Sequence, residues 1–240
     1  MSRSEKGEKL KLAALFSGGK DSTYALKCAY NSGHSISVLV TIYPQVNDSY
    51  MFHVPNLSMV PLLSETLSIP LEKGLTTGIK EEEVKDLENV LKNVIYKYGI
   101  NGVVSGAIAS NYQKSRIDSI CKRLGIVSYT PLWGLDQEKY LEKLIDENYK
   151  IMLVGVYAEG LDKSFLGRII DKNLFLELKR IRDRYKINIA GEGGEYETIV
   201  LDCPMYKKPL LIEDYHTIWT GSSGYIQINQ ASLGNSIRAQ

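Results

Sequence analysis

The chain has 240 residues, of which 44% are hydrophobic and 24% charged, and its formal net charge is +1. This length allows one large α/β domain or two modest ones, and the near-neutral charge excludes a protein that binds nucleic acid through bulk positive charge. Three cysteines lie far apart, which indicates neither a disulfide framework nor a zinc site. The polar N-terminus and the short apolar runs predict neither a signal peptide nor a membrane helix, so we expect a cytoplasmic protein.

A phosphate-binding loop is the first feature predicted along the chain. The apolar segment Leu10–Leu15 is typical of a strand, and the run Ser17–Ser22 (SGGKDS) leads from it into a helical pattern. Two adjacent glycines allow the backbone to approach a ligand closely, and the first N–H groups of the helix point into the same space. Lys20 adds positive charge for a polyphosphate, whereas Asp21 suits a bound Mg²⁺ ion. The alternative is an ordinary strand-to-helix turn.

Strands and helices then alternate as far as about residue 130. The pattern predicts a buried strand Ile36–Tyr43, a helix Leu57–Leu67, an extended segment from Pro70, a helix with an apolar stripe from Val84 to Tyr98, a strand Gly102–Gly106, and a helix opened by a Ser110/Gln113 capping box. This order favours a doubly wound parallel sheet, whose ligands lie at the carboxyl ends of the strands. We assign this domain to residues 1–132, because the segment 131–134 (PLWG) breaks the pattern.

Residues 133–240 are less regular and predict a smaller α+β domain. We expect a helix around Leu141, a strand Met152–Tyr157, a helix Leu174–Tyr185, strands Thr198–Leu201 and Leu210–Glu213, and a hairpin of His216–Thr220 with Tyr225–Ile228. Basic residues crowd the end of the second helix: Lys179, Arg180, Arg182, Arg184 and Lys186. They form either a solvated face that complements the helix dipole or a docking surface for a partner protein.

Three further strings lie where a ligand is expected. Gly191–Thr198 (GEGGEYET) is a predicted site loop, because three glycines and three glutamates suit neither a helix nor a central strand, although a solvated acidic turn has the same composition. Asn47–His53 (NDSYMFH) follows the second strand, and Gly106–Gln113 (GAIASNYQ) follows a later one. His53 is interpreted either as a site residue or as a packing residue.

The Ser17–Ser22 run resembles the loop of the PP-loop ATP pyrophosphatases, which release pyrophosphate from ATP. All four strings together, in this order, resemble the diphthine–ammonia ligase family over nearly the whole chain, in its short archaeal type because no extension follows the hairpin. The resemblance implies a fold like that of the adenine nucleotide α-hydrolases. It also implies amidation of diphthine on elongation factor 2 with ammonium, through an acyl-adenylate, with ATP and Mg²⁺ required and with neither membrane nor direct nucleic-acid binding.

The site residues expected from this resemblance and from the residue chemistry fall into four groups. Catalytic roles are expected for Lys20, Asp21, Glu195 and Glu197; nucleotide binding for Ser17, Gly18, Gly19, Lys20, Asp21, Ser22 and Gly106; substrate binding for His53, Tyr112, Glu192, Gly193, Gly194, Glu195 and Tyr196; and metal binding for Asp21. Two alternatives remain open. One is a tRNA-modifying PP-loop adenylase, which needs a basic surface and, for thiolation, a reactive cysteine pair. The other is a nucleotide-binding module without catalysis.

Overall fold

A five-stranded parallel sheet forms the first part of the molecule in this computed structural model, which describes residues 8–44, 56–79 and 82–235. Its order is β3-β2-β1-β4-β5, and every neighbouring pair is parallel. The strands are β1 (Lys11–Leu15), β2 (Ser35–Pro44), β3 (Leu71–Thr76), β4 (Gly102–Val104) and β5 (Val127–Tyr129). The prediction missed β5, because a three-residue edge strand is too short to show periodicity.

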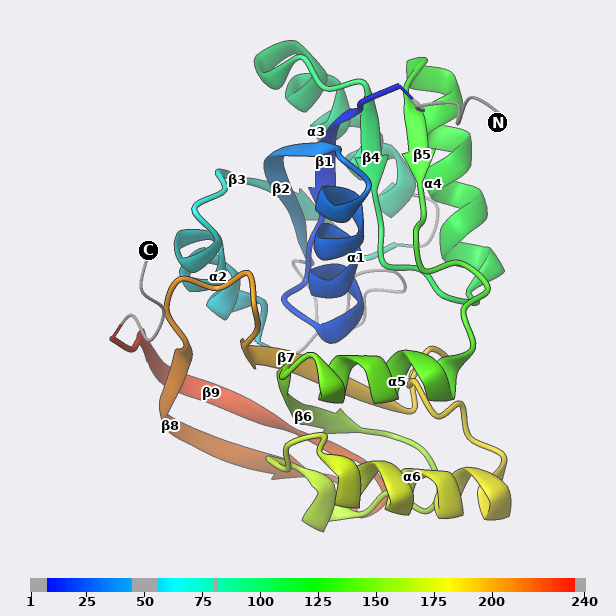
Figure 1. The fold of residues 1–240 in the computed structure, drawn as a ribbon, viewed down its shortest axis with the longest axis vertical. Coiled ribbons are helices and arrows are strands. Elements are labelled where there is room, and N and C mark those ends of the chain that lie inside the picture. The colour runs from blue at the N-terminus through cyan, green and yellow to red at the C-terminus, as the bar shows by residue number, and fades with distance from the viewer. Residues whose placement is uncertain (1–7, 45–55, 80–81, 236–240) are drawn as a thin grey trace, which may run out of the picture.

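Helices cover both faces of this sheet (Figure 1). They are α1 (Lys20–Asn31), α2 (Val60–Leu67, after a 3₁₀ turn Leu57–Met59), α3 (Glu82–Tyr98) and α4 (Asn111–Leu124). Successive residues of β1 point to opposite faces, so Leu12 packs in the core with α1 and α2, while Ala13 packs in a second core with α3 and α4. The predicted doubly wound α/β sheet is thereby confirmed.

An antiparallel sheet of order β7-β6-β9-β8 forms the second part, which confirms the predicted α+β unit. Its strands are β6 (Lys150–Val156), β7 (Tyr196–Asp202), β8 (Leu210–Trp219) and β9 (Gly224–Leu233), accompanied by α5 (Gln137–Asp146), a 3₁₀ turn Lys163–Phe165 and α6 (Lys172–Tyr185). The predicted boundary at residue 132 falls in the connection between β5 and α5.

Two details of this sheet differ from the prediction. The segments 210–213 and 216–220 are not separate strands, because β8 continues through Asp214, where the register shifts on both sides. A bulge of this kind accommodates a residue that breaks the alternation without ending the strand. The GEGGEYET string is a loop only as far as Glu195, since β7 begins at Tyr196. β7 lies at the edge of its sheet, where a polar strand is tolerated.

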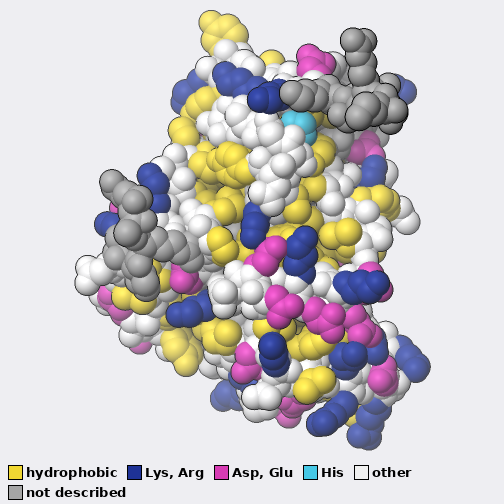
Figure 2. All heavy atoms as spheres, viewed as in Figure 1, with side chains coloured by type: hydrophobic (Ala, Val, Ile, Leu, Met, Phe, Trp, Pro, Cys, Tyr) yellow, Lys and Arg dark blue, Asp and Glu magenta, His cyan; other side chains and the backbone are white. Residues whose placement is uncertain are grey.

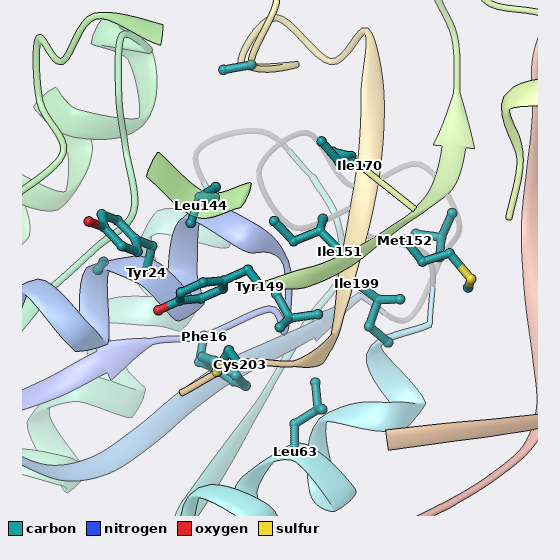
Figure 3. Close-up of a cluster of buried hydrophobic side chains, with 14 of the residues drawn as sticks. Phe16, Tyr24, Leu63, Leu144, Tyr149, Ile151, Met152, Ile170, Ile199 and Cys203 are labelled. Carbon is teal, nitrogen blue, oxygen red and sulfur yellow. The ribbon is translucent and has the colours of Figure 1, made fainter. Parts of the chain in front are cut away.

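The two sheets share one hydrophobic core (Figure 3). Phe16 at the end of β1 and Leu63 of α2 pack in the same cluster as Ile151 of β6 and Ile199 of β7. Backbone pairing adds to this contact, because Val200 N–H donates to the carbonyl of Gly18 at 2.9 Å. The position of the second sheet against the first is therefore fixed by packing and by hydrogen bonds.

Two basic side chains of α6 are paired with an acidic side chain of α5. Lys179 and Arg182 of α6 form ion pairs with Glu138 of α5. Figure 2 shows basic and acidic side chains interspersed over α5 and α6, with no uniform basic surface on that face. Within the described parts of the chain, none of the helices combines the length and apolar character that a membrane crossing requires.

Asn56 provides a test of the link between the two sheets. Its buried side chain donates from Nδ2 to the carbonyl of Ile226 at 2.8 Å and accepts from the N–H of Ile228 at 2.8 Å, so one amide serves two backbone groups of β9. We expect Asn56→Ala to lower the free energy of unfolding by about 2 to 4 kcal/mol, because both groups lose their partner while buried. Urea denaturation measures this change.

Asn229 is the matched control, since it is an exposed asparagine in β9, the strand that the Asn56 side chain contacts. Asn229→Ala should change the free energy of unfolding by less than about 0.5 kcal/mol. Equal effects of the two substitutions would contradict the assigned role of Asn56.

Candidate active site

A cavity of about 550 Å³ lies at the carboxyl ends of β1, β2 and β4. This is the position at which open parallel sheets bind ligands, and the volume is within the range of small-molecule sites. Three segments form most of its wall: residues 15–22 after β1, residues 105–113 after β4, and residues 191–198 at the start of β7. The first sheet thus provides two of these wall segments, and the second sheet provides the third.

Glycines shape the loop after β1. Gly18 has φ +80°, and a Cβ there would come within 2.4 Å of the Leu63 side chain. Gly19 is the N-cap of α1 and has no side chain to cap the helix, and the N–H of Lys20 donates to Oγ1 of Thr198. The next N–H groups of the first turn, those of Asp21 and Ser22, therefore remain for an anion in the cavity.

Gly106 allows the loop after β4 to approach the start of α1. A Cβ at this position would lie 2.6 Å from the carbonyl carbon of Asp21 and 2.8 Å from the nitrogen of Ser22. Both are backbone atoms, which have little freedom to move away. A glycine is required here so that the two cavity loops can lie in contact.

Lys20 is buried, and the second sheet holds it in place. Its ammonium lies 2.8 Å from Oδ2 of Asp21 and 5.3 Å from the centre of the Tyr196 ring. Its backbone N–H donates to Oγ1 of Thr198 at 3.2 Å. The Tyr196 hydroxyl donates to the carbonyl of Ile189 at 2.7 Å, so the buried ring supports Lys20.

Asp21 is positioned by groups from both parts of the chain. Oδ2 accepts from Lys20, and Oδ1 accepts from the hydroxyl of Tyr140 on α5 at 2.8 Å. Among the described residues no three His, Cys, Asp or Glu side chains are grouped as a metal site. Mg²⁺ at phosphate sites needs only one or two carboxylates, because phosphates and water supply its other ligands, and Asp21 fits that requirement.

Two glutamates of the GEGGEYET string hold backbone in place. Oε1 of Glu192 accepts the N–H groups of Ile108, Ala109 and Ser110 at 2.9, 2.9 and 3.0 Å. Glu195 accepts from Asn188 N–H and Gly193 N–H, each at 2.8 Å. The predicted capping box is thus half formed: Ser110 Oγ accepts from Gln113 N–H at 3.4 Å, but the Ser110 N–H pairs with Glu192.

Glu197 is the third glutamate of the string, and it lines the cavity. Burial raises its pKa to about 7; Lys20 opposes the shift, while Asp21 and Glu192 add to it. A carboxyl group with a pKa near neutrality in a cavity can exchange a proton with a substrate.

Most of the predicted site residues meet at this cavity. Its wall includes Ser17, Gly19, Lys20, Asp21, Ser22, Gly106, Tyr112, Glu192, Gly193, Gly194, Tyr196 and Glu197. Gly18 and Glu195 lie behind the wall, where they shape the two loops. His53 and the whole Asn47–His53 string lie outside the described residues. Catalytic and binding roles for these residues stay predictions.

Sequence reasoning did not assign Ser105, Thr198 or Tyr140 to the site. Ser105 is 4% exposed and lines the cavity, and its Oγ has no hydrogen-bond partner among the described residues. Its place directly after β4, as a polar residue ending a buried strand, was a usable signal. Tyr140 gave no such signal, because only the packing of α5 against α1 brings it to Asp21.

The comparisons with known proteins agree with this geometry. A family model of the diphthamide synthase N-terminal domain matches residues 10–128, and a model of its C-terminal domain matches residues 136–233. The chain is 33% identical over 240 residues to the diphthine–ammonia ligase of Bos taurus, covering 91% of this chain and 89% of that protein. The Homo sapiens diphthine–ammonia ligase is 34% identical over 230 residues, covering 87% and 85%.

The relative from Schizosaccharomyces pombe, also named diphthine–ammonia ligase, is 32% identical over 225 residues. That alignment covers 87% of this chain but 37% of the yeast protein. Since the two family models cover both sheets and the vertebrate relatives match along most of their length, the chain belongs to the diphthine–ammonia ligase family of enzymes.

Proposed function

We propose that this chain amidates diphthine on elongation factor 2 with ammonium, forming diphthamide, AMP and pyrophosphate through an acyl-adenylate. The observation that carries the proposal is the first turn of α1, whose N-cap Gly19 has no side chain, beside the buried ammonium of Lys20. Helix N–H groups and a lysine preorganise positive charge where pyrophosphate leaves, which is the main stabilisation that such a reaction needs. The Ser105 hydroxyl, which has no hydrogen-bond partner within the described ranges, supplies one further polar contact for a ligand.

The reaction has two bond exchanges. An oxygen of the diphthine carboxylate bonds to the α-phosphorus of ATP as the bond to the β-phosphate oxygen breaks, so pyrophosphate leaves. Nitrogen then bonds to the activated carbonyl carbon, and AMP leaves. A free carboxylate has no good leaving group, which is why the first exchange must precede the second. Asp21 would hold Mg²⁺ against the phosphates.

Glu197 is our candidate for the group that deprotonates ammonium. Glu197 lines the cavity that Lys20 and Asp21 also line, and its pKa of about 7 leaves it able to accept a proton at neutral pH. We assign Glu192 and Glu195 to holding the loop, since their carboxylates accept backbone N–H groups. Substrate contacts from either residue remain a secondary expectation.

The alternatives receive less support from the described residues. A thiolating tRNA enzyme needs reactive cysteines, but burial raises the pKa of the Cys121 thiol to about 11 and also raises that of Cys28. Direct nucleic-acid binding is not part of our proposal, in keeping with the mixed charge in Figure 2. We place the enzyme in the cytoplasm, and its archaeal origin stays a prediction, because vertebrate relatives are similar in length.

The products of ATP use test the reaction. With diphthine-bearing elongation factor 2 and ammonium, we expect AMP and pyrophosphate in equal amounts, measured by chromatography and a coupled pyrophosphate assay. Without the protein acceptor, AMP should not accumulate. ADP as the main product would contradict the proposal, and AMP formed only with tRNA would support the tRNA-modifying alternative.

Lys20→Met tests the phosphate loop, because methionine keeps the apolar stem beside Tyr196 and removes the charge. We expect kcat/KM to fall about 10- to 150-fold, as loss of a charge-assisted contact of about 1.5 to 3 kcal/mol predicts. Lys27→Met on the same helix is the control, since Lys27 pairs with Glu147 and does not line the cavity. Full turnover by the Lys20 variant would show that the loop is misassigned.

Glu197→Gln tests the acid–base assignment. Because the ionised form accepts the proton, wild-type kcat should rise with pH through about 7 and level off above it. The variant should lose this inflection and about 100- to 10,000-fold of the rate. An inflection that survives the substitution belongs to another group and would refute the assignment.

Folding stability gives a readout of the same pKa without any substrate. A carboxyl whose pKa is raised on folding binds more protons in the native state than in the unfolded one, so it makes stability fall as pH rises from about 4.3 to about 7. Glu197→Gln should remove this loss. The variant's stability relative to wild type should therefore increase between pH 5 and pH 8 in urea denaturation.

A further inference from the structure

Two tyrosines stand beside Glu197 on one face of the antiparallel sheet. Gly155 of β6 is the register partner of Glu197 in β7 and of Tyr225 in β9. Directly opposed residues in antiparallel strands project to the same face. Glu197 and Tyr225 therefore flank the position of Gly155, which has no side chain of its own.

Tyr157 fills the space above Gly155. A Cβ built on Gly155 would lie 2.6 Å from the Tyr157 hydroxyl oxygen and 2.9 Å from two carbons of its ring. Only glycine allows the ring to fold back over the strand in this way. The backbone supports this placement, because Tyr157 N–H donates to the carbonyl of Glu195 at 2.9 Å.

The direction of the Tyr157 pKa shift is consistent with this arrangement. The pKa of Tyr157 is raised first by burial, and then by the nearby Glu197 carboxyl and Tyr225 hydroxyl. Tyr157 is nevertheless 36% exposed, whereas Tyr196, the aromatic residue suggested by sequence, is 2% exposed and already supports Lys20. Glu197 lines the cavity, whereas Tyr157 and Tyr225 lie outside its wall. The three side chains form a row that begins at Glu197.

An exposed aromatic ring beside a carboxylate is suited to a cation that cannot donate a hydrogen bond. Such a cation needs a negative π-face and a nearby negative charge rather than a hydrogen-bond acceptor. Diphthine carries a quaternary trimethylammonium on the carbon that also carries its carboxylate. A cation held in this row would leave that carboxylate close to the cavity wall at Glu197.

We propose that Tyr157, Tyr225 and Glu197 form the recognition site for the quaternary ammonium group of the protein substrate, a proposal that rests on the proposed function. Tyr157 presents its ring to the methyl groups, Tyr225 closes the far side of the row, and Glu197 supplies the charge. The segment GEGGEYE thus contributes its final glutamate to cation recognition, while Glu195 holds the segment's own backbone and Glu192 holds the loop after β4.

Binding of a small cation tests the site without turnover. Choline and its uncharged tert-butyl isostere differ in charge and hardly in shape. We expect choline to shift the ring-proton NMR signals of Tyr157 and Tyr225 in the full chain, and we expect the isostere to have no such effect. Equal shifts from both molecules would overturn the proposal. So would choline-induced shifts that spare both tyrosines in wild type and persist at other residues in Tyr157→Leu.

Turnover then relates the site to the substrate. Tyr157→Leu should raise KM for diphthine-bearing elongation factor 2 about 2- to 30-fold, with KM for ATP unchanged, and Tyr157→Phe should restore most of the loss because the ring remains. Gly155→Ala, which displaces the ring, should resemble Tyr157→Leu. An unchanged KM for the protein in both variants would refute the site.

Tyr215→Leu is the matched control. Tyr215 is half exposed in β8, and its register partner Ile228 lies on the opposite face from Tyr225. Its substitution should leave KM for the protein substrate unchanged, and an effect equal to that of Tyr157→Leu would overturn the proposal. If wild type binds choline at Tyr157 but makes no AMP with diphthine, the proposed function fails and the cation site stands.

Discussion

The site depends on the docking of one strand edge against one loop. β7 lies at the edge of its sheet, and Val200 N–H pairs with the carbonyl of Gly18 while Thr198 Oγ1 accepts from Lys20 N–H. These contacts join the loop after β1 of the parallel sheet to the antiparallel sheet. An edge strand normally leaves the N–H and C=O groups of its outer side unpaired. Here the loop after β1 pairs with one of these groups of β7. The cavity exists because the two sheets meet at this line.

The three glutamates of the GEGGEYET string have different roles because their surroundings differ. Glu192 faces the N–H groups that open α4, so its charge is balanced by oriented dipoles. Glu195 faces N–H groups within its own loop. Glu197 has neither arrangement among the described hydrogen bonds, and burial raises its pKa to about 7. A carboxylate held by backbone N–H groups shapes a site, whereas one without them is available for chemistry.

Sequence reasoning succeeded where a short-range rule determines the structure. Glycines and the strand-to-helix order identified the loop between β1 and α1, and continuous apolar runs identified the parallel strands. It failed where structure depends on contacts distant in sequence: the short strand β5 is defined by its pairing with β4, and the bulge in β8 by its pairing with β9. Tyr140 and Tyr157 reach the site only through tertiary packing, so no local pattern marks them.

Strand alternation explains how one segment serves two sides of the site. At the start of β7, Tyr196 and Thr198 project towards α1, where they contact the ammonium and the backbone of Lys20. Glu197 lies between them and projects to the other face, in register with Gly155 and Tyr225. Side chains alternate in direction along β7, so Tyr196 and Thr198, which support the loop after β1, lie on one face. Glu197 lies on the other face with Tyr157 and Tyr225. Because the side-chain period of a strand is two, a slip of β7 by one residue against β6 would exchange these faces.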